Sequence, residues 1–142
     1  MLFGFILLFL IENLTDSDKI DLLEIGSGTG NLAQTFLNNS SKELNYLGIE
    51  VDDLLIDLSA SIAEVMDSDA RFIQEDAVRP QILQESDVII SDLPVGFYPN
   101  DDIAKKRYKV ASSDEHTYAH HLLMEQSLNI SKRWYCSLFG AR

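Results

Sequence analysis

Apolar residues along the chain alternate between two periodicities, which divide it into predicted strands and helices. Short continuous apolar runs predict strands buried on both faces at 21–25, 46–51, 70–74 and 87–91. Apolar positions at helical spacing predict helices over 2–14, 31–37, 53–66 and 81–84, and another from a capping box at Ser112 and Glu115 to 130. A long loop is predicted over 92–114. Strands alternating with helices predict an α/β fold with a parallel sheet and helices on both faces.

Glycine and acidic residues gather where each predicted strand ends. These groups are Glu24 to Gly30, Glu50, Glu75 to Ala77, and Asp92 to Tyr98. In open sheets of this kind, ligands bind at the carboxyl ends of the strands. The pattern therefore predicts one ligand site at this edge.

Three glycines at alternate positions, Gly26, Gly28 and Gly30, follow the first predicted strand. A dinucleotide fingerprint would need a glycine at position 31, where Asn31 stands, and no lysine follows to complete a phosphate-binding loop. Glu24 precedes the glycines by two residues and would repel a phosphate. A carboxylate at this point suits a ligand that carries an ammonium group instead.

Two further carboxylates end the second and third predicted strands. Glu50 is placed to accept hydrogen bonds from both hydroxyls of a ribose, and Asp76 to accept one from an adenine amino group. Together with the glycine turn, these residues call for a nucleoside with a cationic tail that lacks phosphate. S-adenosylmethionine has this character.

The segment E-x-G-x-G-x-G resembles motif I of the class I S-adenosylmethionine-dependent methyltransferases, and the similarity extends over residues 1 to about 130. SDLPVGFYP at 91–99, GFILLFLIE near the start and EVDDLLIDL after the second strand are similar to bacterial adenine-specific (N6) DNA methyltransferases. The resemblance implies a Rossmann-like sheet, S-adenosylmethionine as cofactor and methylation of adenine N6 in DNA.

The resemblance also implies a set of cofactor-binding residues. The glycine turn and Glu24 would line the methionine end of the cofactor, Glu50 would hold its ribose, and Val51 would pack on its adenine ring. The full implied set is Gly4, Phe5, Glu24, Ile25, Gly26, Gly28, Gly30, Glu50, Val51, Asp76, Ala77 and Asp92. No metal ligand is implied.

The same resemblance places the methyl acceptor at Asp92, Leu93 and Pro94. The Asp92 carboxylate and the Leu93 carbonyl would accept the two N–H bonds of an exocyclic amine and direct its lone pair at the methyl group. Val95 stands where the family has an aromatic residue that stacks on the extruded base. Phe97 and Tyr98, two and three positions later, are the candidates for that stacking.

The formal net charge of −12 disfavours contact with nucleic acid except where basic residues are concentrated. Lys105, Lys106, Arg107 and Lys109 form such a cluster, and either a solvated loop or a phosphate contact explains it. A single cysteine, Cys136, excludes an internal disulfide and fits a cytoplasmic protein. The three histidines are interpreted as helix-surface or capping residues.

We expect one methyltransferase domain over 1–142, with an apolar helix over 1–14 that is too short to cross a membrane and motifs over 22–100. The tail over 131–142 is atypical, because Trp134 to Phe139 would form a strand that no glycine turn introduces. The chain is therefore expected to be a partial domain that lacks the last strands and has an exposed sheet edge through which it could self-associate.

Four alternatives to DNA methylation stay open. The acceptor could be RNA, a protein or a small molecule. The chain could also be a fragment that binds the cofactor without catalysis. DNA is the expected partner of the full-length protein, and contact with it would be weaker for this acidic fragment.

Overall fold

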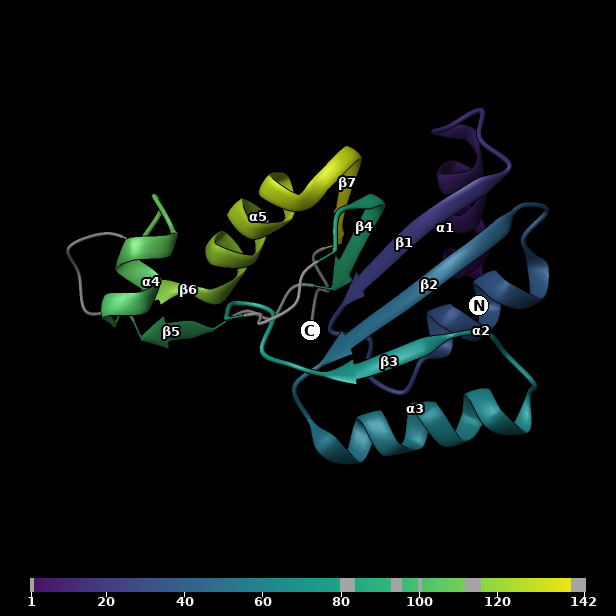
Figure 1. Ribbon diagram of the computed structural model, residues 1–142, viewed down its shortest axis with the longest axis horizontal. Coiled ribbons are helices and arrows are strands. Elements are labelled where there is room, and N and C mark those ends of the chain that lie inside the picture. Colours follow the sequence, from purple (N-terminus) through teal and green to yellow (C-terminus); the bar gives the residue numbers. More distant parts are fainter. Residues whose placement is uncertain (1, 80–83, 93–95, 100, 112–115, 139–142) are drawn as a thin grey trace.

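The computed structural model describes residues 2–79, 84–92, 96–99, 101–111 and 116–138. A five-stranded sheet in the order β3-β2-β1-β4-β7 forms its centre, and all neighbouring strands run parallel (Figure 1). The strands are β1 (Lys19–Ile25), β2 (Glu43–Glu50), β3 (Arg71–Gln74), β4 (Ser86–Asp92) and β7 (Ser131–Leu138). The predicted parallel α/β sheet is confirmed.

Helices cover both faces of the sheet, as the sequence predicts. The helices are α1 (Leu2–Asn13), α2 (Asn31–Asn39), α3 (Asp53–Val65), α4 (Asp102–Arg107) and α5 (Ala119–Ile130). Helices α1 and α2 pack on one face and α4 and α5 on the other, each pair with its own cluster of buried apolar side chains. Leu22 contributes to the first cluster and Leu23 to the second, because successive strand residues point to opposite faces.

The order of the strands creates a switch point between β1 and β4. The chain builds β1, β2 and β3 outward in one direction and then returns to place β4 on the other side of β1. The connections that leave the carboxyl ends of β1 and β4 therefore diverge to opposite sides of the sheet. In doubly wound sheets this divergence opens the crevice in which ligands bind.

The structure corrects the prediction of a long loop over 92–114. This segment contains β5 (Phe97–Pro99) and helix α4, and β5 pairs antiparallel with β6 (His116–Tyr118) in a small separate sheet. Asp101 caps α4 by accepting hydrogen bonds from the backbone N–H groups of Ile103 and Ala104.

The predicted start of the last helix is also wrong, because α5 begins at Ala119 after β6. The predicted helix over 81–84 falls largely outside the described residues. The candidate strand at 134–139 is confirmed over the part that β7 covers. In the described part of the chain, no helix is long and apolar enough to cross a membrane.

Candidate cofactor and acceptor site

The glycine turn is built from backbone groups in left-handed conformations. Gly26, Gly28 and Gly30 have φ angles of 76°, 53° and 76°, a region that side chains with a Cβ rarely adopt. The N–H groups of Gly26 and Ser27 donate to the carbonyl of Ile49, at 2.8 and 3.0 Å. The turn is therefore anchored to the end of the neighbouring strand β2.

Glu50 holds the same turn through its side chain. One carboxylate oxygen accepts from the N–H of Gly28 at 3.0 Å, and the other accepts from the N–H groups of Val51 at 2.8 Å and Asp52 at 3.2 Å. Sequence analysis assigned this carboxylate to a ribose and did not foresee its role in the turn. A carboxylate has about four lone-pair sites, so one site remains for a ligand hydroxyl.

Gly48 in β2 is a site residue that sequence analysis missed. A Cβ at this position would lie 2.7 Å from the Phe72 ring and 2.8 Å from the Ser27 side chain. Gly30 meets the same ring, since a Cβ there would lie 2.8 Å from it. Only glycine allows the turn and Phe72 to close over β2, and a glycine inside an apolar strand is the signal for such a close approach.

Glu24 is a buried carboxylate at the centre of the site. Its side chain is 5% exposed, and its Oε2 has no hydrogen-bond partner. Burial, followed by the negative charges of Glu50 and Asp92, raises the pKa of Glu24 to about 8. A positive charge or a hydrogen-bond donor placed beside Glu24 would therefore be stabilised by this side chain.

The end of β4 lies beside the glycine turn. The Ser91 hydroxyl, which is buried, donates to the carbonyl of Ile25 at 2.8 Å and ties the two strand ends together. The carbonyl of Asp92 would be 3.9 Å from a Cβ on Gly26, and the Asp92 residue is exposed. The predicted acceptor residue therefore stands next to the predicted cofactor turn, whereas Leu93, Pro94 and Val95 lie outside the described residues.

Asp76 and Tyr98 are brought together although 22 residues separate them. The Tyr98 hydroxyl donates to Oδ2 of Asp76, and the N–H of Val78 donates to Oδ1 at 2.9 Å. The guanidinium of Arg79 lies 5.2 Å from the centre of the Tyr98 ring and pairs with Asp101. Burial, with the bond to Asp76 next, raises the pKa of Tyr98 above its usual value.

Phe97 and Tyr98 therefore have different surroundings. Tyr98 is partly buried against Asp76, while Phe97 is 68% exposed and stacks on Tyr118 of β6. Neighbouring residues of a strand point to opposite sides, so one base cannot stack on both rings.

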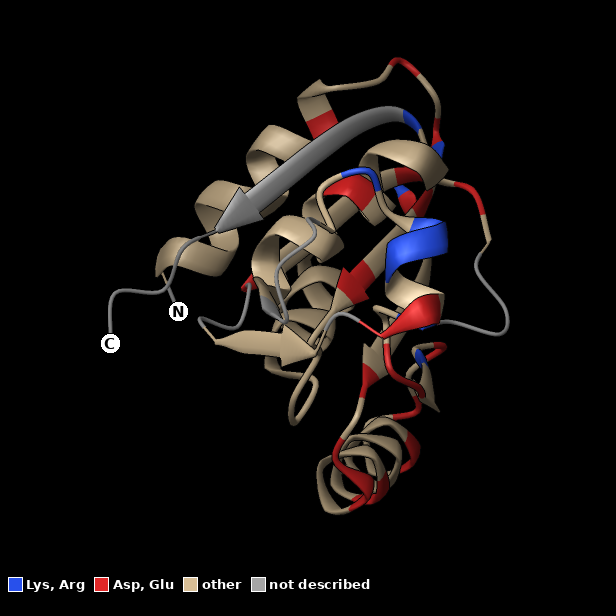
Figure 2. Cartoon of the chain, turned by 90° about the vertical axis from the view of Figure 1, so that its left-hand side faces the viewer, with Lys and Arg blue, Asp and Glu red and all other residues tan. Residues whose placement is uncertain are grey.

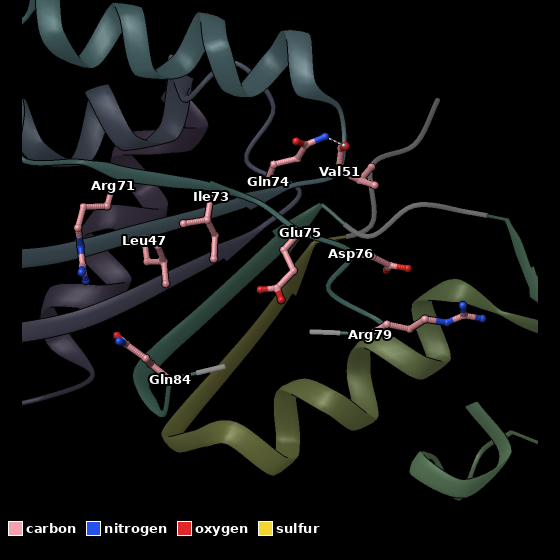
Figure 3. A pocket seen from close by; sticks show the side chains of 9 residues that line it. All are labelled: Leu47, Val51, Arg71, Ile73, Gln74, Glu75, Asp76, Arg79 and Gln84. Atoms are coloured by element: carbon pink, nitrogen blue, oxygen red, sulfur yellow. Dashed lines mark hydrogen bonds between the residues drawn. The ribbon is translucent and has the colours of Figure 1, made fainter. Parts of the chain in front are cut away.

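A cavity of about 610 Å³ opens beside β3 (Figure 3). Its apolar floor comes from the sheet and its polar rim from β3 and the following segment. The lining residues are Leu47, Val51, Arg71, Ile73, Gln74, Glu75, Asp76, Arg79 and Gln84. Val51 and Asp76, predicted on either side of the cofactor adenine, share this cavity. Glu75 also lines it, so both carboxylates at the end of β3 reach the same space.

Comparisons with known proteins agree with this architecture. No protein-family model matches the chain. A Listeria monocytogenes protein, provisionally assigned to the class I S-adenosylmethionine-dependent methyltransferases, has a similar crystal structure. It shares 32% sequence identity and a TM-score of 0.82 over 92% of this chain and 42% of its own. This chain has the class I methyltransferase fold.

Two further comparisons define the extent of the similarity. The uncharacterized protein YtxK of Bacillus subtilis is 34% identical over 131 residues, which are 91% of this chain and 40% of YtxK. A Pyrococcus horikoshii protein, provisionally described as an RNA methyltransferase, has 20% identity and a TM-score of 0.62, over 90% of this chain and 55% of its own. The chain thus spans about two-fifths of YtxK and of the Listeria protein.

Within the methyltransferase fold, four predicted cofactor residues have packing roles or surface positions. Gly4 lies against α2, where its added Cβ would be 3.1 Å from Cγ2 of Thr35, and Phe5 is exposed. The side chains of Ile25 and Ala77 belong to the buried cluster under α4 and α5. Contact of these four residues with a cofactor stays a prediction.

Proposed function

We propose that this chain binds S-adenosylmethionine at the carboxyl edge of its sheet and transfers the methyl group to a nucleic-acid base. The observation that carries the proposal is the buried, unpartnered carboxylate of Glu24 behind a left-handed glycine turn. A phosphate would meet three carboxylates here, those of Glu24, Glu50 and Asp92. A ligand with an ammonium and a sulfonium group is instead attracted by these acidic side chains.

The residues present fit the whole length of this cofactor. Glu24 suits the ammonium group, and the free lone-pair site of Glu50 suits a ribose hydroxyl. Val51 and Asp76 line the adjoining cavity, which has room for an adenine. The bound cofactor supplies an electrophilic methyl group, and the protein's task is to orient the acceptor and keep the site dry.

For the acceptor we propose the exocyclic N6 amine of adenine in DNA. Asp92 supports this choice because it is the exposed last residue of β4 and its carbonyl lies beside Gly26. An aromatic amine is a weak nucleophile, since its lone pair is delocalised into the ring. By accepting one N–H bond, Asp92 would localise that lone pair and take part of the charge that develops during transfer.

RNA is the alternative acceptor, and the fold shared with the Pyrococcus protein provides its support. An adenine amine offers the same two N–H bonds in both nucleic acids. The choice between them is therefore an outcome of the test below.

The test is transfer of labelled methyl groups to DNA and RNA by the wild-type chain and by Asp92→Ala. Removing a group that positions or accepts a proton is expected to lower the transfer rate by at least about 100-fold. Asp69→Ala, an exposed carboxylate ahead of β3, is the matched control and should leave the rate unchanged. Transfer retained in Asp92→Ala would overturn the role of Asp92.

Calorimetry separates cofactor binding from transfer. Binding that Gly28→Val abolishes, together with transfer that Asp92→Ala abolishes, supports the whole proposal. A folded wild-type chain that does not bind S-adenosylmethionine would overturn the cofactor assignment. Binding without transfer to either nucleic acid would overturn the assignment of the acceptor.

A further inference from the structure

An exposed aromatic stack lies on the small sheet that follows strand β4. The rings of Phe97 and Tyr118 have centroids 4.7 Å apart and an interplanar angle of 25°. Phe97 is 68% exposed and Tyr118 is 43% exposed. The ring of His121, which is also exposed, lies edge-on to Tyr118 at 5.6 Å. We call Phe97, Tyr118 and His121 the aromatic platform.

The proposed methyl-transfer site does not account for this platform. Tyr98 alone reaches toward Asp76 and the cavity, so its neighbour Phe97 faces the other side of β5. Single exposed aromatic residues are common on proteins, but several rings in mutual contact at the surface indicate a binding site. A planar, unsaturated group is the ligand that such rings select.

Basic residues stand beside the platform, on helix α4 and two positions after its end. Lys105, Lys106, Arg107 and Lys109 are all exposed and make up four of the eleven basic residues of the chain. Figure 1 shows α4 next to the β5–β6 sheet, and Figure 2 shows the basic turn of α4 in blue among segments that carry mainly acidic residues, in red. In the described residues, no ion pair uses the ammonium groups of Lys105, Lys106 or Lys109.

The helix dipole accounts for only part of this cluster. Basic residues in the last turn of a helix interact favourably with its C-terminal carbonyls. Lys109 lies beyond the end of α4, however, and the whole chain carries a net charge of −12. A basic segment beside exposed aromatic rings is the combination that binds single-stranded nucleic acid, through its phosphates and its bases respectively.

We propose that the aromatic platform and α4 form a docking surface for single-stranded nucleic acid, which stacks a base next to the methyl acceptor. Inside a duplex the stacked neighbours cover both faces of a base, so the strand must be single-stranded or locally opened. Phe97 follows Asp92 by five positions along the chain, which limits their Cα separation to about 18 Å. The platform therefore holds a base that flanks the acceptor. This inference rests on the proposed function for its acceptor, but binding can be measured without cofactor.

Binding of a labelled single-stranded oligonucleotide of about 12 nucleotides, followed by fluorescence anisotropy, tests the surface. DNA and RNA of one sequence, and the DNA duplex, serve as the probes. Phe97→Leu and Tyr118→Leu remove a stacking ring and are each expected to weaken single-strand binding about tenfold. Phe9→Leu is the matched control, because Phe9 is 65% exposed on α1, and it should leave binding unchanged.

The salt dependence of oligonucleotide affinity tests the contribution of the positive charges of α4. The double change Lys105→Gln and Lys106→Gln should lower the slope of log affinity against log salt by about 1.4, at about 0.7 per lost phosphate contact. The control removes the same net charge through Lys19→Gln and Lys132→Gln, at the amino-terminal ends of β1 and β7, and should leave the slope unchanged.

Each outcome decides for or against the surface. Tighter binding of the single strand, weakened only by the platform and α4 variants, supports it, and the DNA and RNA arms identify the nucleic acid. Absence of binding, equal binding of the duplex, or equal effects of the control variants would overturn it. Calorimetry measures whether Phe97→Leu still binds S-adenosylmethionine. If the nucleic-acid surface is overturned but the cofactor still binds, the proposed function stands.

Discussion

The glycine turn after β1 and the segment after β4 meet at the same edge of the sheet, but different forces hold them. Backbone N–H groups that donate to Ile49 and Glu50 hold the turn, and every glycine in it has a positive φ. Besides the backbone pairing of β5 with β6, side chains hold the segment after β4, through the bond from Tyr98 to Asp76 and the stack of Phe97 on Tyr118.

This difference determines how each region responds to change. In a turn built from the backbone, a Cβ is strained wherever φ is positive, so substitution of its glycines is disfavoured. A region held by side chains can exchange one partner for another when a ligand arrives. The turn is therefore suited to an invariant cofactor, and the later segment to a variable acceptor. The four predictions below test this comparison, from the largest expected effect to the smallest.

The largest effect concerns Glu24 and pH. Its pKa of about 8 in the folded chain exceeds the usual value of 4.5, so the folded state holds its proton more tightly than the unfolded state. Protonated Glu24 makes its full contribution to the free energy of unfolding below pH 4.5, and this contribution is lost as the pH rises to about 8. Glu24→Gln cannot lose a proton. We expect its advantage over wild type in unfolding free energy to grow by about 3 kcal/mol between pH 5.5 and 8.5.

Urea denaturation of both proteins across this pH range measures the difference. Other carboxylates titrate in both proteins and cancel in the comparison. Glu64→Gln, an exposed change on α3, serves as control and should follow wild type. A constant difference between Glu24→Gln and wild type would show that Glu24 is ionised in the folded protein throughout.

The second effect separates two glycines within the turn. Gly28→Ala places a Cβ in open space and costs only the left-handed backbone, about 1–2 kcal/mol. Gly30→Ala adds a clash with the Phe72 ring at 2.8 Å, so we expect a further loss of about 1–3 kcal/mol. Chemical denaturation of the two variants gives both values. Equal losses would mean that Phe72 moves away without cost.

The third effect tests the region held by side chains. Tyr98→Phe removes the donor to Asp76 in a partly exposed setting, and we expect a loss of about 1 kcal/mol in unfolding free energy. Tyr118→Phe removes the hydroxyl of the exposed neighbouring ring and should cost less than about 0.5 kcal/mol. Equal costs, measured by thermal or urea unfolding, would mean that the bond from Tyr98 to Asp76 does not organise this segment.

The smallest effect distinguishes packing from cofactor contact at Gly4. Alanine favours the helix by up to about 1 kcal/mol, but its Cβ would lie 3.1 Å from Cγ2 of Thr35. The gain in helix propensity and the close contact with Thr35 oppose each other, so Gly4→Ala should change the free energy of unfolding by less than about 0.5 kcal/mol. Cofactor affinity, measured by calorimetry, should also stay constant. A selective loss of affinity would place Gly4 beside the cofactor.

Most of the sheet could be predicted from the sequence because its signals are local. Short apolar runs identified the strands β1, β2, β3 and β4 in their order, and three glycines after the first strand identified the turn. The acidic residues that end the strands converge because the strands are parallel. Glu24, Glu50 and Asp92 therefore reach one site, as the coulombic effects on the pKa of Glu24 also indicate.

Only the tertiary structure decided how the remaining contacts form. The strands β5 and β6 span three residues each and pair with one another, so no local periodicity marks them. The capping-box pattern at Ser112 predicted a helix too early, because His116 to Tyr118 pair with β5 instead. The helical signal of Asp101 and the basic residues after it was present but was interpreted as a loop.

The sequence by itself determined the sheet, the glycine turn and the carboxylate edge, because period, conformational preference and charge are properties of neighbouring residues. The tertiary structure decided that Gly48 admits Phe72, that Tyr98 bonds Asp76 and that Phe97 faces Tyr118. These contacts join residues that lie far apart along the chain. Their geometry depends on how whole elements pack, which no short stretch of sequence encodes.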